Sequence, residues 1–411
     1  MFEASVLCLV ITALAAYVNH RLFRLPITIG VMVVALLLSL ALLALDRLGF
    51  GLLHEFEMRI LHRIDFSSLL LNGMLSVLLF AGALQIDLSR LHRYRWQVFA
   101  LSVVGTMVST ALIGAVMYFA LPVAGLSLGL GYCLLFGALI SPTDPIAVIS
   151  ILKGAGVSDE VNMVISGESL FNDGVGVVLF TLIFAFAATG TPPTAAGVWS
   201  MLWREVGGGL LLGALLGGSL FVLLRSINDY KVEVLLTLAG VLGGYELARK
   251  LHVSGPLAMV VAGVIIGNHG RTLAMSDTTR HHVDLFWELL DDILNAVLFM
   301  LIGLEIMVVE LSSTIAIAAI AAIALALFAR LVAVGLPVLI FRDWFRLPSG
   351  SWRILTWAGL RGGISVALVL SLNPGHEREL LLAFTYAVVV FSILVQGLTL
   401  RRVVAHSTRS P

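Results

Sequence analysis

Thirteen apolar segments follow one another along this chain, and most are long enough to cross a lipid bilayer as helices. A helix needs about 20 apolar residues to span the hydrocarbon core, where it satisfies its own backbone polar groups. The sequence therefore predicts an all-α polytopic membrane protein with about thirteen transmembrane helices. The segments lie near residues 3–20, 27–45, 67–86, 97–121, 126–152, 160–188, 205–224, 232–249, 254–268, 287–307, 312–341, 351–372 and 379–400.

Composition excludes the common alternatives to a membrane protein. Of the 411 residues, 59% are hydrophobic and only 12% are charged, about half the charged share of a soluble domain. The net charge of zero implies no nucleic-acid partner, and two cysteines inside apolar runs exclude a disulfide scaffold. The first segment lacks the features of a cleaved signal peptide, so we expect it to remain a transmembrane helix. The more charged stretch 46–66 is predicted to be a linker or an interfacial helix.

The distribution of Lys and Arg predicts the orientation in the membrane. An odd number of spans puts the two termini on opposite sides. With the N-terminus outside, the inner loops hold most of the 25 Lys and Arg residues, as the positive-inside rule requires. The sequence therefore predicts an outer N-terminus and a cytoplasmic C-terminus. Two basic residues, Arg330 and Arg361, lie instead in the middle of apolar spans.

Five charged residues are predicted to lie inside the membrane, where a charge persists only with a partner or a function. They are Asp144, Glu168, Asp173, Arg330 and Arg361, and their formal charges sum to −1. Two ion pairs would leave one carboxylate over. In a low-dielectric site such a carboxylate binds a proton readily and can exchange it for a cation, which is the minimum requirement of a cation/proton exchanger.

The fifth segment contains the sequence GALISPTDPIAVIS, in which Pro142 and Pro145 bracket Thr143 and Asp144. Each proline removes a backbone donor and clashes with the preceding turn, so we expect the helix to be broken here. The carbonyl groups freed by the break and the Asp144 carboxylate are oxygen ligands of the kind that hard cations prefer. The alternative is a simple proline kink.

The twelfth segment has Gly359, Gly362 and Gly363 around Arg361, and it too is predicted to be unwound or closely packed. It occupies the place in the second half of the chain that the fifth segment occupies in the first. Paired broken helices are typical of transporters built from inverted repeats, so we expect two inverted six-helix repeats whose breaks cross at mid-membrane. Asp144 would then face helix N-termini and Arg361 helix C-termini.

The sixth segment, ISGESLFNDGVGVVLF, carries two polar pairs at helical spacing. Ser169 and Asp173 share one face, and Glu168 and Asn172 share another about 100° away. We expect one face to bind an ion and the other to contact a neighbouring helix. The alternative is that both acids form structural salt bridges, which we favour for Glu168. The remaining acids toward the ends of spans are interpreted as interfacial: Glu246, Asp291, Asp292 and Glu305.

These motifs resemble those of the monovalent cation/proton antiporters of the NhaP and sodium–hydrogen exchanger branch. The resemblance lies in SPTDPIAV, GESLFNDGVGVV, GLRGGISVALVLSL and FSILVQGLTLRRV, and in the N-terminal part only in LLFAGALQIDLSRL. It implies a homodimer in a bacterial inner membrane that works by elevator-type alternating access. The implied domains are dimerisation helices 1–3 (1–96), core helices 4–6 (97–188), a linking helix with dimerisation helices 7–10 (189–310), core helices 11–13 (311–402) and a short cytoplasmic tail (403–411).

The resemblance also implies roles for the buried polar residues. Asp173, Ser169 and Thr143 would bind the ion, with Asp144 close by, and Asn172 would mark the electroneutral branch. The remaining charged residues would form structural ion pairs. Glu168 would pair with Arg330, and Arg361 would balance the charge of helix ends and of Asp144. Some relatives carry an acid on helix three, where this chain has Ala81 and Ala83.

The function implied is the export of cytoplasmic Na+ (or Li+) in exchange for external H+, one for one, without a cofactor or an enzymatic step. Transport of K+ by the same fold is the nearest alternative. A cation channel is a second, but the sequence shows no filter repeat. An intramembrane hydrolase using Ser141 or Ser169 is a third, but neither span contains a His or Lys to activate the serine.

Overall fold

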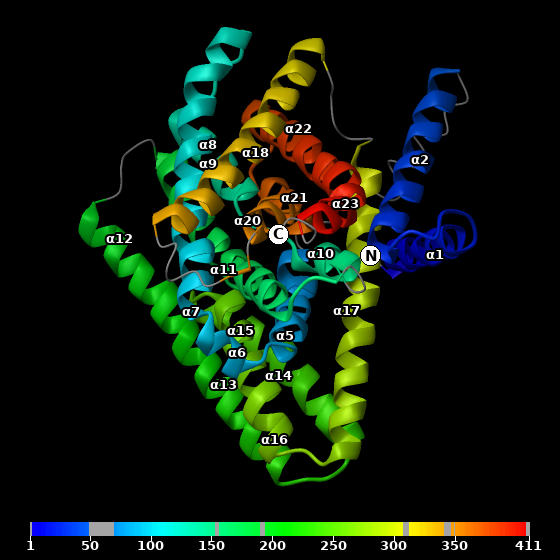
Figure 1. The fold of residues 1–411 in the computed structure, drawn as a ribbon, viewed down its shortest axis with the longest axis vertical. Helices are drawn as coiled ribbons and strands as arrows, with labels where there is room; N and C mark the ends of the chain where they lie inside the picture. The colour runs from blue at the N-terminus through cyan, green and yellow to red at the C-terminus, as the bar shows by residue number, and fades with distance from the viewer. Residues whose placement is uncertain are drawn as a thin grey trace.

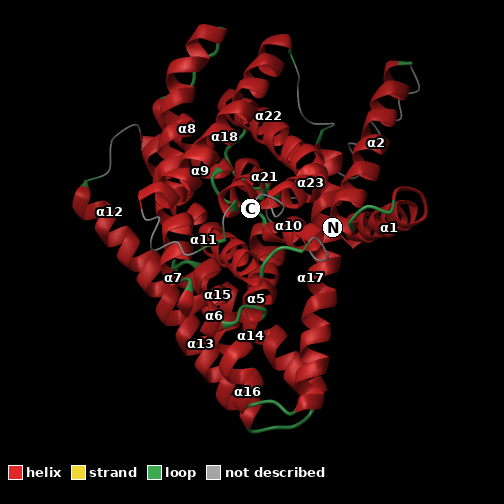
Figure 2. Cartoon of the chain, viewed as in Figure 1, coloured by secondary structure: helices red, strands yellow, loops and turns green. Residues whose placement is uncertain are grey.

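The computed structural model describes residues 2–48, 70–152, 156–189, 194–306, 312–340, 347–348 and 350–407. Within these ranges every regular element is a helix (Figure 2), and the predicted all-α fold is confirmed. The α-helices are α1 (Phe2–Val18), α2 (Ile27–Arg47), α5 (Leu75–Leu84), α6 (Leu88–Arg93), α7 (Arg95–Phe99), α8 (Thr106–Ala120), α9 (Leu130–Ile140), α10 (Pro145–Leu152), α11 (Asp159–Thr189), α12 (Ala195–Leu202), α13 (Gly208–Arg225), α14 (Tyr230–Leu251), α15 (Gly255–Ile265), α16 (Arg271–Leu273), α17 (Asp277–Glu305), α18 (Ser313–Ile340), α20 (Ser351–Trp357), α21 (Gly363–Leu370), α22 (His376–Phe391) and α23 (Leu398–Ser407).

Helix lies on every predicted apolar segment, often lengthened by a π-helical turn, as at Ala100–Gly105 between α7 and α8 and at Ser392–Gly397 between α22 and α23. In the described part of the chain, seven helices are long and apolar enough to cross a membrane by themselves. The helices α14 and α17 are as long but more highly charged. The total of thirteen crossings and the inverted repeat stay predictions. The predicted linker 46–66 lies mostly outside the described residues.

Two boundaries differ from the prediction. The ninth segment is expected to end near residue 268, but α15 continues through a π-helical turn into α16, so helix extends from residue 255 to 273. The tenth was expected to begin near residue 287, but α17 begins at Asp277, where the Ser276 hydroxyl accepts a hydrogen bond from the Thr279 amide (3.3 Å). Side-chain capping of this kind satisfies donors at a helix start, and it moves Asp291 and Asp292 to the middle of the helix.

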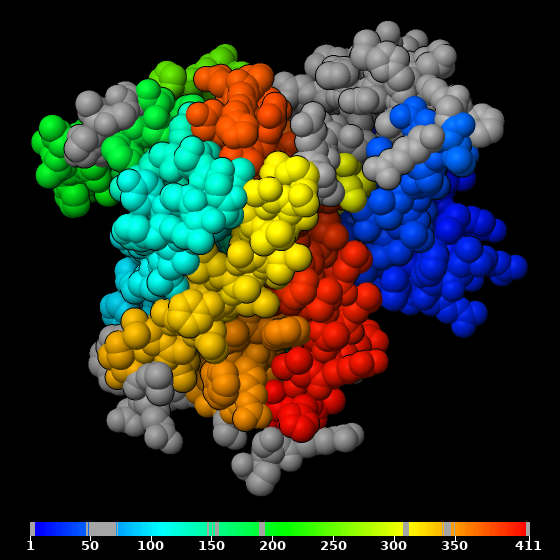
Figure 3. Space-filling view, turned by 90° about the horizontal axis from the view of Figure 1, so that it is seen from above, coloured from blue at the N-terminus to red at the C-terminus, as the bar shows by residue number. Residues whose placement is uncertain are grey.

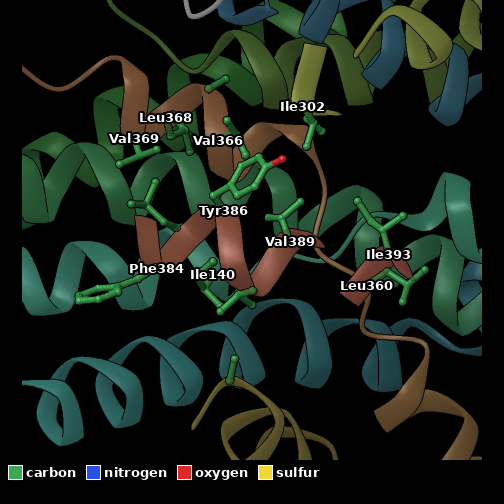
Figure 4. Close-up of a cluster of buried hydrophobic side chains, with 14 of the residues drawn as sticks. Ile140, Ile302, Leu360, Val366, Leu368, Val369, Phe384, Tyr386, Val389 and Ile393 are labelled. Carbon is green, nitrogen blue, oxygen red and sulfur yellow. The ribbon is translucent and has the colours of Figure 1, made fainter. Parts of the chain in front are cut away.

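Figure 1 shows two long helical arms, α12–α13 and α17, which converge near α16. Buried side chains form two clusters. One joins α5, α13, α14 and α15 to the N-terminal half of α17, where Trp287 contacts Phe80 at 4.7 Å between ring centroids. The larger cluster holds α8, α9, α18, α21 and α22 (Figure 4). It also includes α2 and the C-terminal half of α17, and Figure 3 shows α1 and α2 at one edge of the molecule beside the C-terminal helices. Helix α17 therefore packs into both clusters.

Candidate ion-binding site

The helix break predicted in the fifth segment separates α9 from α10. The last α-helical bond of α9 runs from the Ser141 amide to the Gly137 carbonyl (3.0 Å), and α10 begins at Pro145. The guanidinium of Arg361 donates from Nη1 to the carbonyls of Ser141 (2.5 Å) and Pro142 (2.9 Å). A cation at the C-terminal end of a helix offsets its partial negative charge. Arg361 therefore caps carbonyl groups that the prolines leave without helical donors.

The twelfth segment is broken as well, between α20 and α21, and the two breaks cross. The amide of Asp144 donates to the carbonyl of Leu360 (2.8 Å), which joins the two unwound stretches directly. On the other side of the crossing, a Cβ built on Gly362 would lie 2.6 Å from Oδ2 of Asp144. The carboxylate therefore packs against backbone at the start of α21. This places a negative charge at a helix N-terminus, the end whose dipole favours it.

The side chain of Thr143 lies in the break and contacts α11. Its hydroxyl hydrogen-bonds to the Ser169 hydroxyl (2.9 Å) and accepts from Nδ2 of Asn172 (2.9 Å), while its amide donates to Oδ1 of Asn172 (3.3 Å). Asn172 is thus bonded to Thr143 through both ends of its amide and holds the break against α11. One turn of helix from Ser169, Asp173 is 8% exposed. The structure therefore brings Thr143, Ser169, Asn172 and Asp173 together.

A second polar contact of α11 joins it to α18. The carboxylate of Glu168 forms a two-pronged ion pair with Arg330 of α18, Nη1 to Oε1 and Nη2 to Oε2, the latter at 3.0 Å. Both residues are buried, at 1% and 6% exposure. Arg330 also donates from Nη2 (2.9 Å) and Nε (3.3 Å) to the carbonyl of Leu355 in α20. The pair therefore links three helices, and its charges cancel inside the protein.

The site opens into a cavity of about 310 Å³. Its walls come from α5, the α9/α10 break, α11, α17 and α21, and its lining includes Thr143, Asp144 and Asp173. It is also lined by Arg90 and Asp159, which form an exposed ion pair (2.9 Å from Nη1 to Oδ2). The cavity thus extends from exposed residues at one end to the buried carboxylate of Asp173.

Sequence reasoning missed the contribution of α17 to this cavity. Asp291 and Asp292, interpreted as interfacial, line it together with Glu288 and Asn295, a role that this interpretation did not include. Glu305, at the other end of α17, is only 6% exposed. The signal available in the sequence was the i, i+3, i+4, i+7 spacing of residues 288, 291, 292 and 295, which places them on one helix face. Glu246 does lie in an exposed ion pair with Arg249 (2.8 Å).

Helix α5, the third predicted span, contributes no acidic side chain to the cavity. The residues of α5 that line it are leucines and Gly82. Ala83 instead faces α15. A Cβ atom added to Gly263 of α15 would lie 2.6 Å from the Cβ atom of Ala83. The small residues at 81–83 therefore suit close helix packing.

Comparison with known proteins places this arrangement in a family. A family model described as "Sodium/hydrogen exchanger, transmembrane" matches residues 9–406. The chain is 50% identical to the Na+/H+ antiporter NhaP of Pseudomonas aeruginosa, over 97% of this chain and 95% of that protein. It is 36% identical to the antiporter NhaH of Halobacillus aidingensis, over 90% of each. Among solved structures, the sodium proton antiporter MjNhaP1 of Methanocaldococcus jannaschii has a TM-score of 0.76 at 17% identity, covering 98% of this chain and 97% of that one. The chain is therefore a multi-pass membrane protein that belongs to the sodium/hydrogen exchanger family.

Proposed function

We propose that this protein is a secondary active antiporter that exports cytoplasmic Na+ (or Li+) in exchange for external H+. The observation that carries the proposal is the group formed by Asp173, Thr143 and Ser169 where two broken helices cross. Carboxylate, hydroxyl and carbonyl oxygens suit a hard cation, and a buried carboxylate holds either a proton or a cation. The two relatives named above, both called Na+/H+ antiporters, support the same activity. Na+ and H+ are substrates here, and no resident cofactor or chemical step is needed.

The charges around the site favour electroneutral exchange. Glu168 is balanced by Arg330, and we assign the charge of Arg361 to offset Asp144, which leaves one negative charge on Asp173. That carboxylate can bind one proton or one monovalent cation, so either loaded state is neutral and crosses the low-dielectric barrier at low cost. Asn172 cannot ionise, and its amide is already bonded to Thr143.

Exchange is expected to carry no net charge, one cation moving for each proton. The measurement is current on a solid-supported membrane loaded with proteoliposomes, or a potential-sensitive dye in free proteoliposomes. A Na+ jump should produce proton flux without a sustained current, and clamping the membrane potential should not change the rate. A sustained current that scales with the potential would reject the one-for-one stoichiometry and would point to a second ionised group in transport.

The cavity supports an alternating-access mechanism with the site open to the cytoplasm. Arg90 and Asp159 at its exposed end lie between predicted spans, in segments that the distribution of Lys and Arg assigns to the cytoplasmic side if the N-terminus is outside. We assign the moving core to residues 97–188 and 311–402, and the dimerisation domain of a homodimer to 1–96 and 189–310. Movement of the core past α17 would carry Asp173 from one side of the membrane to the other.

Transport assays separate this function from its alternatives. Purified protein is reconstituted in liposomes with an imposed pH gradient, and uptake of radioactive Na+ or K+ is followed. An antiporter accumulates the cation against its gradient and collapses the pH gradient in proportion. A K+/H+ antiporter would do this with K+ alone. A channel would pass the cation without stoichiometric proton movement, and that result would exclude the proposal.

Replacement of Gly362 is expected to impair transport without unfolding the protein. In Gly362→Ala the added methyl group would press on Oδ2 (2.6 Å) and Cβ (2.8 Å) of Asp144, and displacement of a functional group by about 1 Å can reduce a rate roughly 100-fold. The matched control is Gly243→Ala on α14, where a Cβ meets nothing within 4 Å. Exchange rates in proteoliposomes should fall for the first variant only. Equal rates in both would show that Asp144 tolerates displacement.

A further inference from the structure

Helix α17 presents a continuous polar stripe to the cavity, opposite the crossing of the broken helices. Glu288, Asp291, Asp292 and Asn295 all line the cavity and lie at i, i+3, i+4 and i+7 on one face. Burial differs among the residues of the stripe: Glu288 and Asp292 are exposed, Asp291 is half-buried and Asn295 is fully buried. The stripe thus runs inward from exposed residues to the depth of the site.

The deepest member of the stripe has an unused acceptor. Nδ2 of Asn295 donates to the backbone carbonyl (2.8 Å) and to Oδ1 (3.1 Å) of Asp291. Both of those atoms are acceptors, so they fix which end of the Asn295 amide carries the NH2 group. The oxygen of Asn295 is then the end of the amide that is not bonded to Asp291, and within the described residues it has no hydrogen-bond partner. A buried carbonyl oxygen without a hydrogen-bond donor is unfavourable. It would be stabilised by a donor or by a cation that accepts its lone pairs.

The stripe and the Asp173 site share one electrostatic environment. Asp144 is close enough to interact electrostatically with both Asp173 and Asp291, and all three line the same cavity. Within the described ion pairs of the protein, no Lys or Arg is bonded to Asp291. A carboxylate beside an unpaired amide oxygen, facing two further carboxylates, is an oxygen-lined and strongly electronegative wall.

We propose that Asp291 and Asn295 form a second cation-binding subsite on α17, which takes a small monovalent cation on its way to Asp173. The inference rests on the proposed function. The ligands are the Asp291 carboxylate and the free Asn295 oxygen, both of the hard type that Na+ prefers. Because α17 lies outside the proposed moving core, this subsite stays on its side of the cavity and loads the carrier without adding to the transported charge.

Direct binding of radioactive Na+ to purified protein in detergent, by scintillation proximity against choline, tests the subsite. The Asp173→Asn variant removes the proposed carrier ligand but should still bind Na+ saturably. Adding Asp291→Asn or Asn295→Leu should abolish that residual binding, whereas adding Asp277→Asn, an exposed acid in the first turn of α17, should leave it unchanged. Absence of Na+ binding by Asp173→Asn, or residual binding that survives both second substitutions, would overturn the proposal and indicate that water satisfies Asn295.

Transport kinetics provide the second readout and separate this inference from the function on which it rests. With Asp173 intact, Asp291→Asn should raise the apparent KM for Na+ roughly tenfold, as expected for loss of one charged ligand, and leave the maximal rate near that of the unmodified protein. Asp277→Asn should change neither value. If exchange proceeds with an unchanged KM in Asp291→Asn, the subsite is wrong and the antiport function stands. If Na+ binds as described but no Na+/H+ exchange occurs, the function is wrong and the subsite stands.

Discussion

Asp173→Asn is expected to abolish exchange of both ions while the protein still folds. The side chain is 8% exposed at the inner end of the cavity, next to the bonded hydroxyls of Thr143 and Ser169. An amide has nearly the same shape as the carboxylate but can neither release a proton nor neutralise a cation. If the rate depends on this single charge, proton-driven Na+ uptake into proteoliposomes should fall to the level of empty liposomes.

Two controls decide whether that loss reflects the carrier role. Asp277→Asn removes the same charge from an exposed position at the start of α17 and should transport normally. The size-exclusion profile and thermal stability of Asp173→Asn in detergent should match those of the unmodified protein, since no described ion pair involves Asp173. Exchange at a normal rate by the folded Asp173→Asn variant would show that another group carries the proton.

The two helix breaks were predictable because their causes are local. Pro142 and Pro145 prevent regular helix by covalent geometry, and the glycines around Arg361 permit unwinding without steric cost. Charge in an apolar span then demands nearby opposite charge or dipoles. From these facts the sequence predicted that Arg361 lies at helix C-termini, and its bonds to the Ser141 and Pro142 carbonyls have that geometry.

The role of α17 was not predictable from its own sequence. Asp291 and Asp292 lie near the start of the apolar run, where interfacial acids are common, and their positions in the cavity depend on where α17 begins and how it packs. The start and the packing of α17 are both set by the tertiary structure. The helix starts ten residues earlier than expected, and Trp287 packs against Phe80 of α5. Only the assembled packing of α5, α11 and α17 shows that the polar face of α17 is turned toward Asp173.

Asn172 shows a different limit of sequence reasoning. Its place beside Asp173 put it on the second face of the segment, which was expected to contact a neighbouring helix, and the resemblance made it a mark of the electroneutral branch. The structure uses both ends of its amide to bond the Thr143 hydroxyl and amide, an arrangement that depends on the path of the unwound chain. A helical wheel places Asn172 about 100° from Asp173, but the wheel cannot indicate that the facing backbone offers one donor and one acceptor at the right separation.

Separate neutralisation of Glu168 and Arg330 is expected to destabilise the protein strongly, and joint neutralisation to restore much of the loss. Removing one partner of a buried ion pair leaves an uncompensated charge, at a cost of roughly 3–5 kcal/mol. Glu168→Gln would leave Arg330 with only the Leu355 carbonyl as a described partner, and Arg330→Met would leave the Glu168 carboxylate buried at 1% exposure. The double variant has no buried charge at this position.

Thermal unfolding in detergent of the two single variants and the double variant forms a double-mutant cycle, which isolates the coupling between the residues. The matched control is the same cycle on Glu246 and Arg249, an ion pair of similar length on an exposed face of α14, where solvent screening should leave no measurable coupling. The buried pair should therefore show strong coupling and the exposed pair none. Additive losses at Glu168 and Arg330 would mean that the two charges are stabilised independently. Glu168 and Arg330 could then not be counted as a neutral pair, and the argument for one-for-one exchange, which depends on that pair, would lose its basis.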